Sequence, residues 1–235
     1  MTLPELLTQA RHVFLDFDGP ICAVFGGAVS ALVAAKRLAA TLHAHGLNLT
    51  SDAERTTDPF QHLRAAARHG WEHAAVAEGA LRDLEVEAVA TAPITPGALD
   101  TLTALTASGR TATIVSNNSV AAVTAFVDRH ALRPYLRAIV ARADPDPALL
   151  KPNPHLVHRA ITALGADPAQ CLLIGDSVAD ITAARSAGTR VIAYANKPGK
   201  HQAFAPYHPE AVITDMRTIA ETLATLPRNN GADAR

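Results

Sequence analysis

The stretch 171–180 has the sequence CLLIGDSVAD. Its first four residues are apolar, which predicts a buried strand, and the glycine that follows is typical of a strand end. Asp176 comes directly after this glycine, and Asp180 follows four residues later. Because residues four apart lie on one face of a helix, both carboxylates can face a single point near the helix start. The stretch therefore predicts a strand, a turn and a helix, with two acids at the junction.

Strands and helices alternate on both sides of this stretch. A short apolar strand is predicted at 11–16, near the N-terminus. The later order is helix 96–107, strand 111–116, helix 119–130, strand 137–141, helix 154–164, strand 171–175, helix 178–187, strand 190–193, and a last strand and helix within 211–226. Such alternation indicates an α/β fold with a doubly wound, mostly parallel sheet of the Rossmann-like type.

Residues 26–92 interrupt this alternation. Strand-like runs are absent there, and helices are predicted near 27–45, 59–69 and 72–91. We therefore expect two domains: a core of residues 1–25 and 93–235, and an inserted helical domain of residues 26–92. The end, 227–235, is expected to be a frayed tail.

Composition excludes several classes of protein. Hydrophobic residues make up 49% of the 235, enough for a core, and 21 basic against 22 acidic residues leave a net charge of −1. Such a balance gives no electrostatic basis for binding nucleic acid or an anionic membrane. Two cysteines, Cys22 and Cys171, are too few for a disulfide framework, and we expect buried thiols. With no signal peptide or bilayer-length apolar run recognised, we expect a cytoplasmic protein.

Two acids follow the first predicted strand, in Asp16-Phe17-Asp18-Gly19. Residues two apart in a strand face the same side, so both carboxylates can enter one pocket while Phe17 turns away. One acid then suits the role of nucleophile or metal ligand, and the other that of general acid and base. Solvated acids beside a turn are the ordinary alternative.

Further polar residues lie where other strands end. Ser116-Asn117-Asn118 precedes a predicted helix, and these groups can form an anion cradle or ordinary caps. Lys151 also precedes a helix start, where a cation is unfavourable unless an anion lies nearby; a solvated loop lysine is the alternative. Carboxylates gathered from Asp16, Asp176 and Asp180 would repel without a cation, and oxygen ligands favour Mg²⁺.

The four clusters, in this order, resemble the motifs of the haloacid dehalogenase superfamily. Those motifs are Asp-x-Asp-Gly, a strand-end Ser or Thr, a Lys, and Gly-Asp-x-x-x-Asp, and here they match 16–19, Ser116, Lys151 and 175–180. The resemblance covers about 11–20 and 95–226. It implies the phosphatase branch, similar to phosphoglycolate phosphatase and β-phosphoglucomutase, with residues 26–92 as a small helical cap between the first and second motifs.

The resemblance also implies roles for these residues. Asp16 is the expected nucleophile, which forms an aspartyl-phosphate, and Asp18 the expected general acid and then base. Ser116 and the Asn117 backbone would hold phosphoryl oxygens, while Lys151 would neutralise charge. Mg²⁺ would bind Asp16, the Asp18 main-chain carbonyl and Asp176, with Asp180 as a further, orienting carboxylate of the metal site. The partner implied is a small phosphorylated metabolite, and the chain is expected to be a monomer or homodimer.

Other functions share part of this pattern. A phosphomutase of the β-phosphoglucomutase type has the same core motifs, whereas a haloacid dehalogenase lacks the second acid that Asp18 supplies. A receiver-like signalling domain is about half as long and has no helical insert. A catalytically idle phosphate-binding protein is the remaining alternative, and the complete motif set argues against it.

Two features concern the cap. Pro20 follows the first motif, where the family usually has Thr or Val, so Gly26 and Gly27 are the expected flexible point. The cap is also rich in basic side chains, one or two of which are expected to contact a polar or anionic leaving group. These are His43, His45, Arg55, His62, Arg64, Arg68, His69, His73 and Arg82.

Overall fold

The computed structural model describes residues 1–229, apart from the side chains at 51 and 52. Most of the expected tail at 227–235 therefore lies outside the described residues. Within them, six parallel strands form one sheet in the order β3-β2-β1-β4-β5-β6. The strands are β1 (His12–Leu15), β2 (Thr111–Ser119), β3 (Leu136–Arg142), β4 (Cys171–Gly175), β5 (Arg190–Tyr194) and β6 (Ala211–Ile213). The predicted α/β sheet is confirmed.

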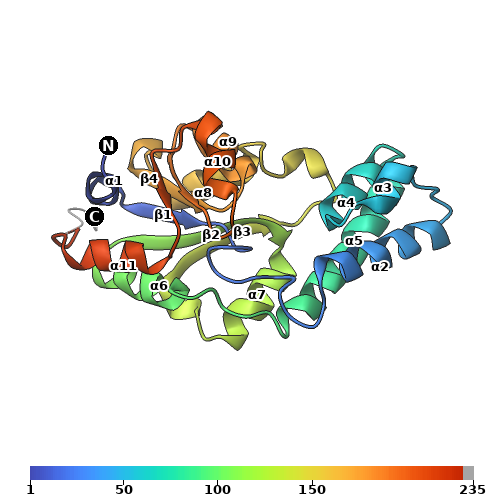
Figure 1. Ribbon diagram of the computed structural model, residues 1–235, viewed down its shortest axis with the longest axis horizontal. Coiled ribbons are helices and arrows are strands. Elements are labelled where there is room, and N and C mark those ends of the chain that lie inside the picture. The colour runs from blue at the N-terminus through green and yellow to red at the C-terminus, as the bar shows by residue number, and fades with distance from the viewer. Residues whose placement is uncertain (230–235) are drawn as a thin grey trace.

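Helices cover both faces of this sheet (Figure 1). One face carries α6 (Ala98–Ala107), α7 (Val120–Arg129) and α11 (Arg217–Ala224), and the other carries α8 (His155–Leu164), α9 (Val178–Ser186) and α10 (Lys200–Phe204). Because both faces are covered, the central strands are almost continuously apolar. Phe14 and Leu15 of β1, like Leu173 and Ile174 of β4, have no exposed surface.

The inserted segment lies at one end of the molecule (Figure 1). It comprises α2 (Ala31–Ala44), α3 (Ser51–Arg55), α4 (Pro59–Ala67) and α5 (Trp71–Val89). Leu38, Leu63 and Leu81 are buried between α2, α4 and α5. Asp58 caps α4, because its Oδ1 accepts a hydrogen bond from the Phe60 N–H at 2.9 Å. The division into two domains at residues 26 and 92 stays a prediction.

The two connections to the inserted helices run side by side. The Ala23 N–H donates to the Pro93 carbonyl at 3.1 Å, and the Thr95 N–H donates to the Ile21 carbonyl at 2.9 Å. A side chain at Gly27 would have no room, because a Cβ there would lie 2.5 Å from the Thr91 carbonyl oxygen. The close approach of the two connections is therefore enough to explain why residue 27 is a glycine. Flexibility of the chain at Gly27 stays a prediction.

The strand β2 runs further than expected. It continues through Ser119, with a shift of register against β3 between Ser116 and Ser119. Apolar periodicity ends at Val115, so the polar residues beyond it carried no strand signal. The helices α1 (Leu3–Gln9), α3 and α10 were not predicted, because five to seven residues are too few to show a helical period.

Two expectations from composition concern thiols and membranes. Cys22 and Cys171 are both free and buried, as expected. Among the described residues, none of the helices has the length and apolar character needed to cross a membrane. The expected cytoplasmic location and oligomeric state stay predictions.

We expect Gly27→Ala to lower the free energy of unfolding by about 1–3 kcal/mol, because the new methyl group forces the two connections apart. Gly79→Ala is the matched control: it lies within α5, and the nearest atom to its new Cβ is Arg82 Nη2 at 3.6 Å. That change should raise stability by about 0.5–1 kcal/mol through helix propensity. Urea unfolding measures both, and equal effects would contradict the role assigned to Gly27.

Candidate active site

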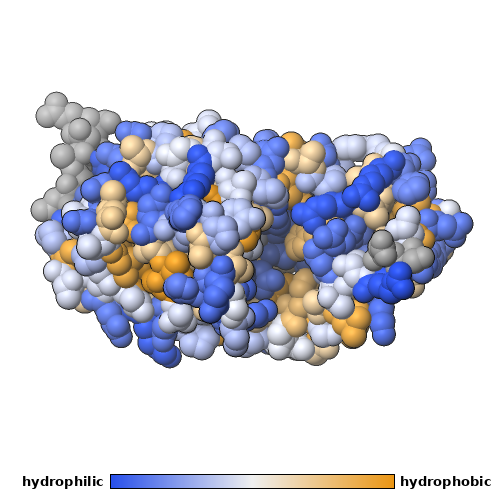
Figure 2. Space-filling model, turned by 45° about the horizontal axis from the view of Figure 1, so that its top comes forward, coloured by the Kyte–Doolittle hydropathy of each residue, from blue (hydrophilic) through white to orange (hydrophobic). Residues whose placement is uncertain are grey.

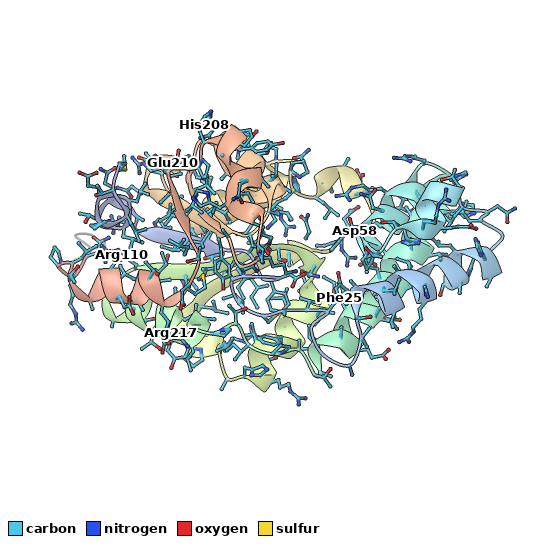
Figure 3. All side chains as sticks on the ribbon, in the orientation of Figure 1. Phe25, Asp58, Arg110, His208, Glu210 and Arg217 are labelled. Atoms are coloured by element: carbon cyan, nitrogen blue, oxygen red, sulfur yellow. The ribbon has the colours of Figure 1, made fainter. Side chains whose placement is uncertain are left out.

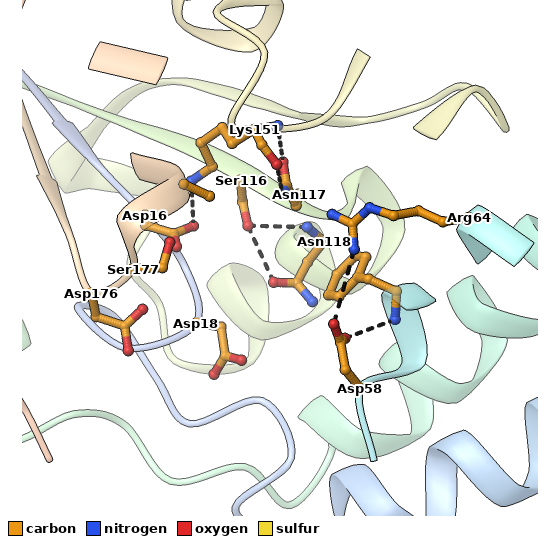
Figure 4. Close-up of a pocket in the computed structure, with 12 residues that line it drawn as sticks. Asp16, Asp18, Asp58, Arg64, Ser116, Asn117, Asn118, Lys151, Asp176 and Ser177 are labelled. Carbon is orange, nitrogen blue, oxygen red and sulfur yellow. Dashed lines mark hydrogen bonds and ion pairs between the residues drawn. The ribbon is translucent and has the colours of Figure 1, made fainter. Parts of the chain in front are cut away.

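A pocket opens between the core and the inserted helices, where the carboxyl ends of β1, β2 and β4 meet. Figure 2 shows the surface hollowed between these two parts. The cavity has a volume of about 240 Å³ (Figure 4). Its lining comprises Asp16, Asp18, Asp58, Phe60, Arg64, Ser116, Asn117, Asn118, Lys151, Asp176, Ser177 and Ala179. The four predicted clusters therefore all contribute to one pocket.

Lys151 is the buried cation of this pocket. Its Nζ lies 2.9 Å from Asp16 Oδ1 and 2.5 Å from Asp180 Oδ1, and it donates to the Val115 carbonyl at 2.9 Å. Burial alone would lower the pKa of the ammonium group, but Asp16 and Asp180 outweigh that effect and raise the pKa above its ordinary value. Lys151 is therefore held charged, and a solvated loop lysine is ruled out.

The two acids of the first motif, Asp16 and Asp18, both line the pocket, and burial raises the pKa of each. Phe17, between them, turns into the core and packs edge-on against Phe126, with ring centroids 5.3 Å apart. Burial and the nearby Asp180 raise the pKa of Asp16 to about 8, despite the opposing charge of Lys151. Burial also raises the pKa of Asp18 to about 6, and its Oδ1 accepts a hydrogen bond from the Val24 N–H at 2.9 Å.

Of the two acids in the stretch 171–180, Asp180 is buried behind the pocket and Asp176 lines it. Asp180 is fully buried, and its Oδ2 accepts hydrogen bonds from the Ser177 N–H at 3.1 Å and hydroxyl at 2.6 Å. Asp176 faces the pocket and forms an ion pair with Lys200, while Asn196 Nδ2 donates to its Oδ2 at 3.1 Å. Sequence reasoning missed Asn196, in the loop after β5, and Lys200, the first residue of the short helix α10, because neither belongs to a recognisable motif.

Gly19 shows how tightly these segments meet. Its φ is +115°, and a Cβ at this position would lie 2.5 Å from Asp176 Cγ. Both the backbone conformation and the close contact exclude a side chain. The glycine of the first motif therefore lets Asp176 approach the turn after β1.

The acids provide a donor set for a metal ion. Oxygen atoms of Asp16, Asp176 and Asp180 all lie within 4.8 Å of one another. Asp180 already accepts hydrogen bonds at both oxygens, so Asp16 and Asp176 are the more available ligands. A divalent cation here would stabilise the ionised form of Asp16, whose pKa is raised by burial among like charges. An all-oxygen set of this kind fits Mg²⁺.

The last residues of β2 approach Lys151. Asn117 does not point its amide at the cavity: its Nδ2 donates to the Lys151 carbonyl at 3.0 Å, and its Oδ1 accepts from the Lys151 N–H at 2.8 Å. Ser116 is buried, and its hydroxyl donates to Asn118 Oδ1 at 3.2 Å. The side chain of Asn117 thus fixes Lys151, and its main chain and Ser116 remain as candidate groups for an anion.

The inserted helices contribute three residues to the pocket: Phe60 and Arg64 of α4, and Asp58, which caps that helix. Figure 3 shows Asp58 on the side of the inserted helices that faces the core. Arg64 Nη1 lies 3.9 Å from Asp58 Oδ2. Of the nine basic residues considered above, all within the described part, only Arg64 lines this pocket. Sequence reasoning missed Asp58 and Phe60, whose pattern indicates only a helix start.

Comparisons with known proteins agree with this geometry. The family model for haloacid dehalogenase-like hydrolases matches residues 10–188. The phosphoglycolate phosphatase of Caulobacter vibrioides is 37% identical over 93 residues, which are 40% of this chain and 38% of that protein. The chain thus matches less than half the length of that curated relative.

Solved structures extend the similarity to nearly the whole fold. A predicted phosphatase from Clostridium acetobutylicum superposes with a TM-score of 0.72 at 16% identity, over 92% of this chain and 99% of that one. CbbY from Rhodobacter sphaeroides, solved in complex with phosphate, gives a TM-score of 0.67 at 19% identity, again over 92% and 99%. At these identities the similarity concerns the fold alone.

Proposed function

Because this chain belongs to the haloacid dehalogenase-like hydrolase family, we propose that it hydrolyses phosphomonoesters of small metabolites, with Asp16 as the nucleophile. The observation that carries this proposal is the contact of Asp16 with the buried Lys151 at 2.9 Å. A charged lysine in that place can bind a phosphoryl oxygen while it holds the carboxylate that attacks. Phosphoryl transfer needs mainly such positioning and charge stabilisation.

The contacts of Asp16 leave one oxygen for the reaction. Lys151 Nζ and the Phe17 N–H, at 2.7 Å, both contact Oδ1. Among the described residues, Oδ2 has no hydrogen-bond partner. In the proposed first step Oδ2 attacks phosphorus, the bond from phosphorus to the ester oxygen breaks, and an aspartyl-phosphate forms.

Asp18 completes both half-reactions in this proposal. It gives its proton to the departing ester oxygen, and it then takes a proton from the water that attacks the aspartyl-phosphate. Phosphate leaves, and Asp16 is regenerated. Asp18 lines the same cavity as Asp16, so it can reach a leaving group bound there.

The metal and anion groups belong to the same proposal. Asp16, the Asp18 main-chain carbonyl and Asp176 would hold Mg²⁺, with Asp180 as the orienting carboxylate. When bound, Mg²⁺ would supply positive charge for a phosphoryl oxygen. Ser116 and the Asn117 main chain would bind the remaining oxygens.

Arg64 suggests the class of substrate. It reaches the cavity from α4, opposite the acids of the core, and its nearest acid, Asp58, is 3.9 Å away and half-exposed. A guanidinium there suits a carboxylate on the leaving group. We therefore propose a small phosphorylated acid, which agrees with the name of the Caulobacter vibrioides relative.

Substitution of the two acids should separate their roles. Asp16→Asn removes the nucleophile, so turnover should fall to background. Asp18→Asn keeps the nucleophile but loses proton transfer, which contributes about 10²–10⁴-fold. With acetyl phosphate, whose leaving group needs no proton, Asp18→Asn should accumulate phosphoprotein. Mass spectrometry after rapid quench should find phosphate on the peptide that contains Asp16, and phosphate on another residue would overturn the mechanism.

Chelation should test the metal site. We expect EDTA to abolish hydrolysis, Mg²⁺ to restore it, and Ca²⁺ to inhibit, because Ca²⁺ takes more oxygen ligands at longer distances and so occupies both oxygens of Asp16. The measurement is the initial rate after exhaustive dialysis. Full turnover in EDTA would contradict the assignment.

Arg64→Met tests the proposed substrate class. The value of kcat/KM for phosphoglycolate should fall about 10- to 100-fold, as expected for a lost hydrogen bond between charged groups. Hydrolysis of ethyl phosphate, which lacks the carboxylate, should change little. The control is Arg68→Met, an exposed position at the end of α4. Equal losses on both substrates would argue against a carboxylate at Arg64.

A further inference from the structure

A buried ion cluster joins the inserted helix α5 to the core, outside the groups used above. Arg142, the last residue of β3, is 2% exposed. Its Nη1 lies 2.7 Å from Glu78 Oε1, and its Nη2 lies 2.6 Å from Glu85 Oε2. Glu85 has no exposed surface. Two charged residues of α5 are therefore buried against a strand of the core.

The same cluster contacts the last residues of β2, 117–119. Glu85 Oε2 accepts a hydrogen bond from the Ser119 N–H at 2.8 Å, and Oε1 accepts from Asn118 Nδ2 at 3.1 Å. Arg142 Nε donates to the Asn117 carbonyl at 3.0 Å. These contacts fall where the register of β2 against β3 shifts, between Ser116 and Ser119. Side chains thus hold the end of β2 where its pairing with β3 is irregular.

Asn118 links this cluster to the candidate phosphate-binding hydroxyl. Its Oδ1 accepts from the Ser116 hydroxyl at 3.2 Å, and its own N–H donates to Ser116 Oγ at 3.1 Å. Asn118 directs its NH₂ toward Glu85 Oε1 and its carbonyl toward the Ser116 hydroxyl, so each end of its amide has one partner. Glu85 thereby sets the orientation of the Ser116 hydroxyl through Asn118.

We propose that Glu85 and Arg142 are positioning residues for phosphate binding, so that the inserted domain helps to build the anion site of the core. The inference rests on the proposed function. Fold stability alone gives little reason for the cluster, since well-packed apolar residues of similar volume often stabilise a protein as well as a buried ion pair does. A fully satisfied polar network, in contrast, fixes one geometry.

The test replaces the pair by apolar residues of similar length, in the variant E85M/R142M. Glu78 keeps a partner in it, because Arg82 Nη1 lies 3.1 Å from Glu78 Oε2. The matched control is R37M/E87M. It removes an ion pair of 2.8 Å that also joins α5 to a neighbouring element, α2, but both side chains are about half-exposed.

Inorganic phosphate is the probe, measured by calorimetry and as a competitive inhibitor of the full-length protein. We expect E85M/R142M to weaken phosphate binding and raise KM by about 10- to 100-fold, the size of loss that follows removal of the hydrogen-bond partner of a metal ligand. The variant's Tm is expected to fall, because the Asn118 NH₂, the Ser119 N–H and the Asn117 carbonyl lose their partners, so phosphate affinity of the folded variant is the deciding readout. R37M/E87M should bind phosphate unchanged. A merely structural cluster would lower Tm but leave the phosphate affinity of the folded variant intact, and that result would overturn the positioning role.

A single substitution covers the case in which E85M/R142M does not fold. Asn118→Ala leaves the pair of Glu85 and Arg142 in place but cuts its link to Ser116, and it should weaken phosphate binding in the same direction. Unchanged affinity in Asn118→Ala, or equal loss in R37M/E87M, would overturn the positioning role. Failure of the original protein to bind phosphate would instead count against the proposed function.

Discussion

Repulsion between buried carboxylates is the constraint on which the active-site end of this molecule depends. Asp16 and Asp180 come from separate strand ends, and Lys151 Nζ contacts an oxygen of each. Without that cation these two carboxylates, whose oxygens lie within 4.8 Å of one another, would repel. The placement of Lys151 is in turn fixed by Asn117, which bonds both its N–H and its carbonyl. One ammonium group therefore connects three segments of the chain.

The parallel sheet makes this convergence possible. Residues that follow β1, β2 and β4 arrive at the same edge, because adjacent parallel strands end on the same side. For this reason the sequence alone was sufficient to predict that Asp16, Ser116 and Asp176 line one cavity. Each lies within a few residues of an apolar run, and the run reveals where the strand ends.

Other parts of the site had no such signal. Glu78 and Glu85 are seven residues apart on one face of α5, and a pair of acids at that spacing is typical of a solvated helix face. Their burial follows from Arg142, which is 57 residues beyond Glu85 in the chain. Lys200 likewise reaches Asp176 from a segment without a motif. Contacts of this kind depend on the packing of distant elements, which local patterns do not encode.

The inserted helices contact the site at two places that differ in their physical character. Arg64 of α4 lies at an open wall of the cavity, where its partner Asp58 is half-exposed and water competes for both. Glu85 of α5 is enclosed, and each of its oxygens is bonded to the core. Substitution of Arg64 is expected to change which substrates bind in the cavity with little loss of folding stability. Substitution of Glu85, in contrast, leaves its charged and polar partners without hydrogen bonds. Variation in substrate is therefore easiest at α4, while the end of α5 is constrained to stay with the strands that are proposed to bind the phosphoryl group.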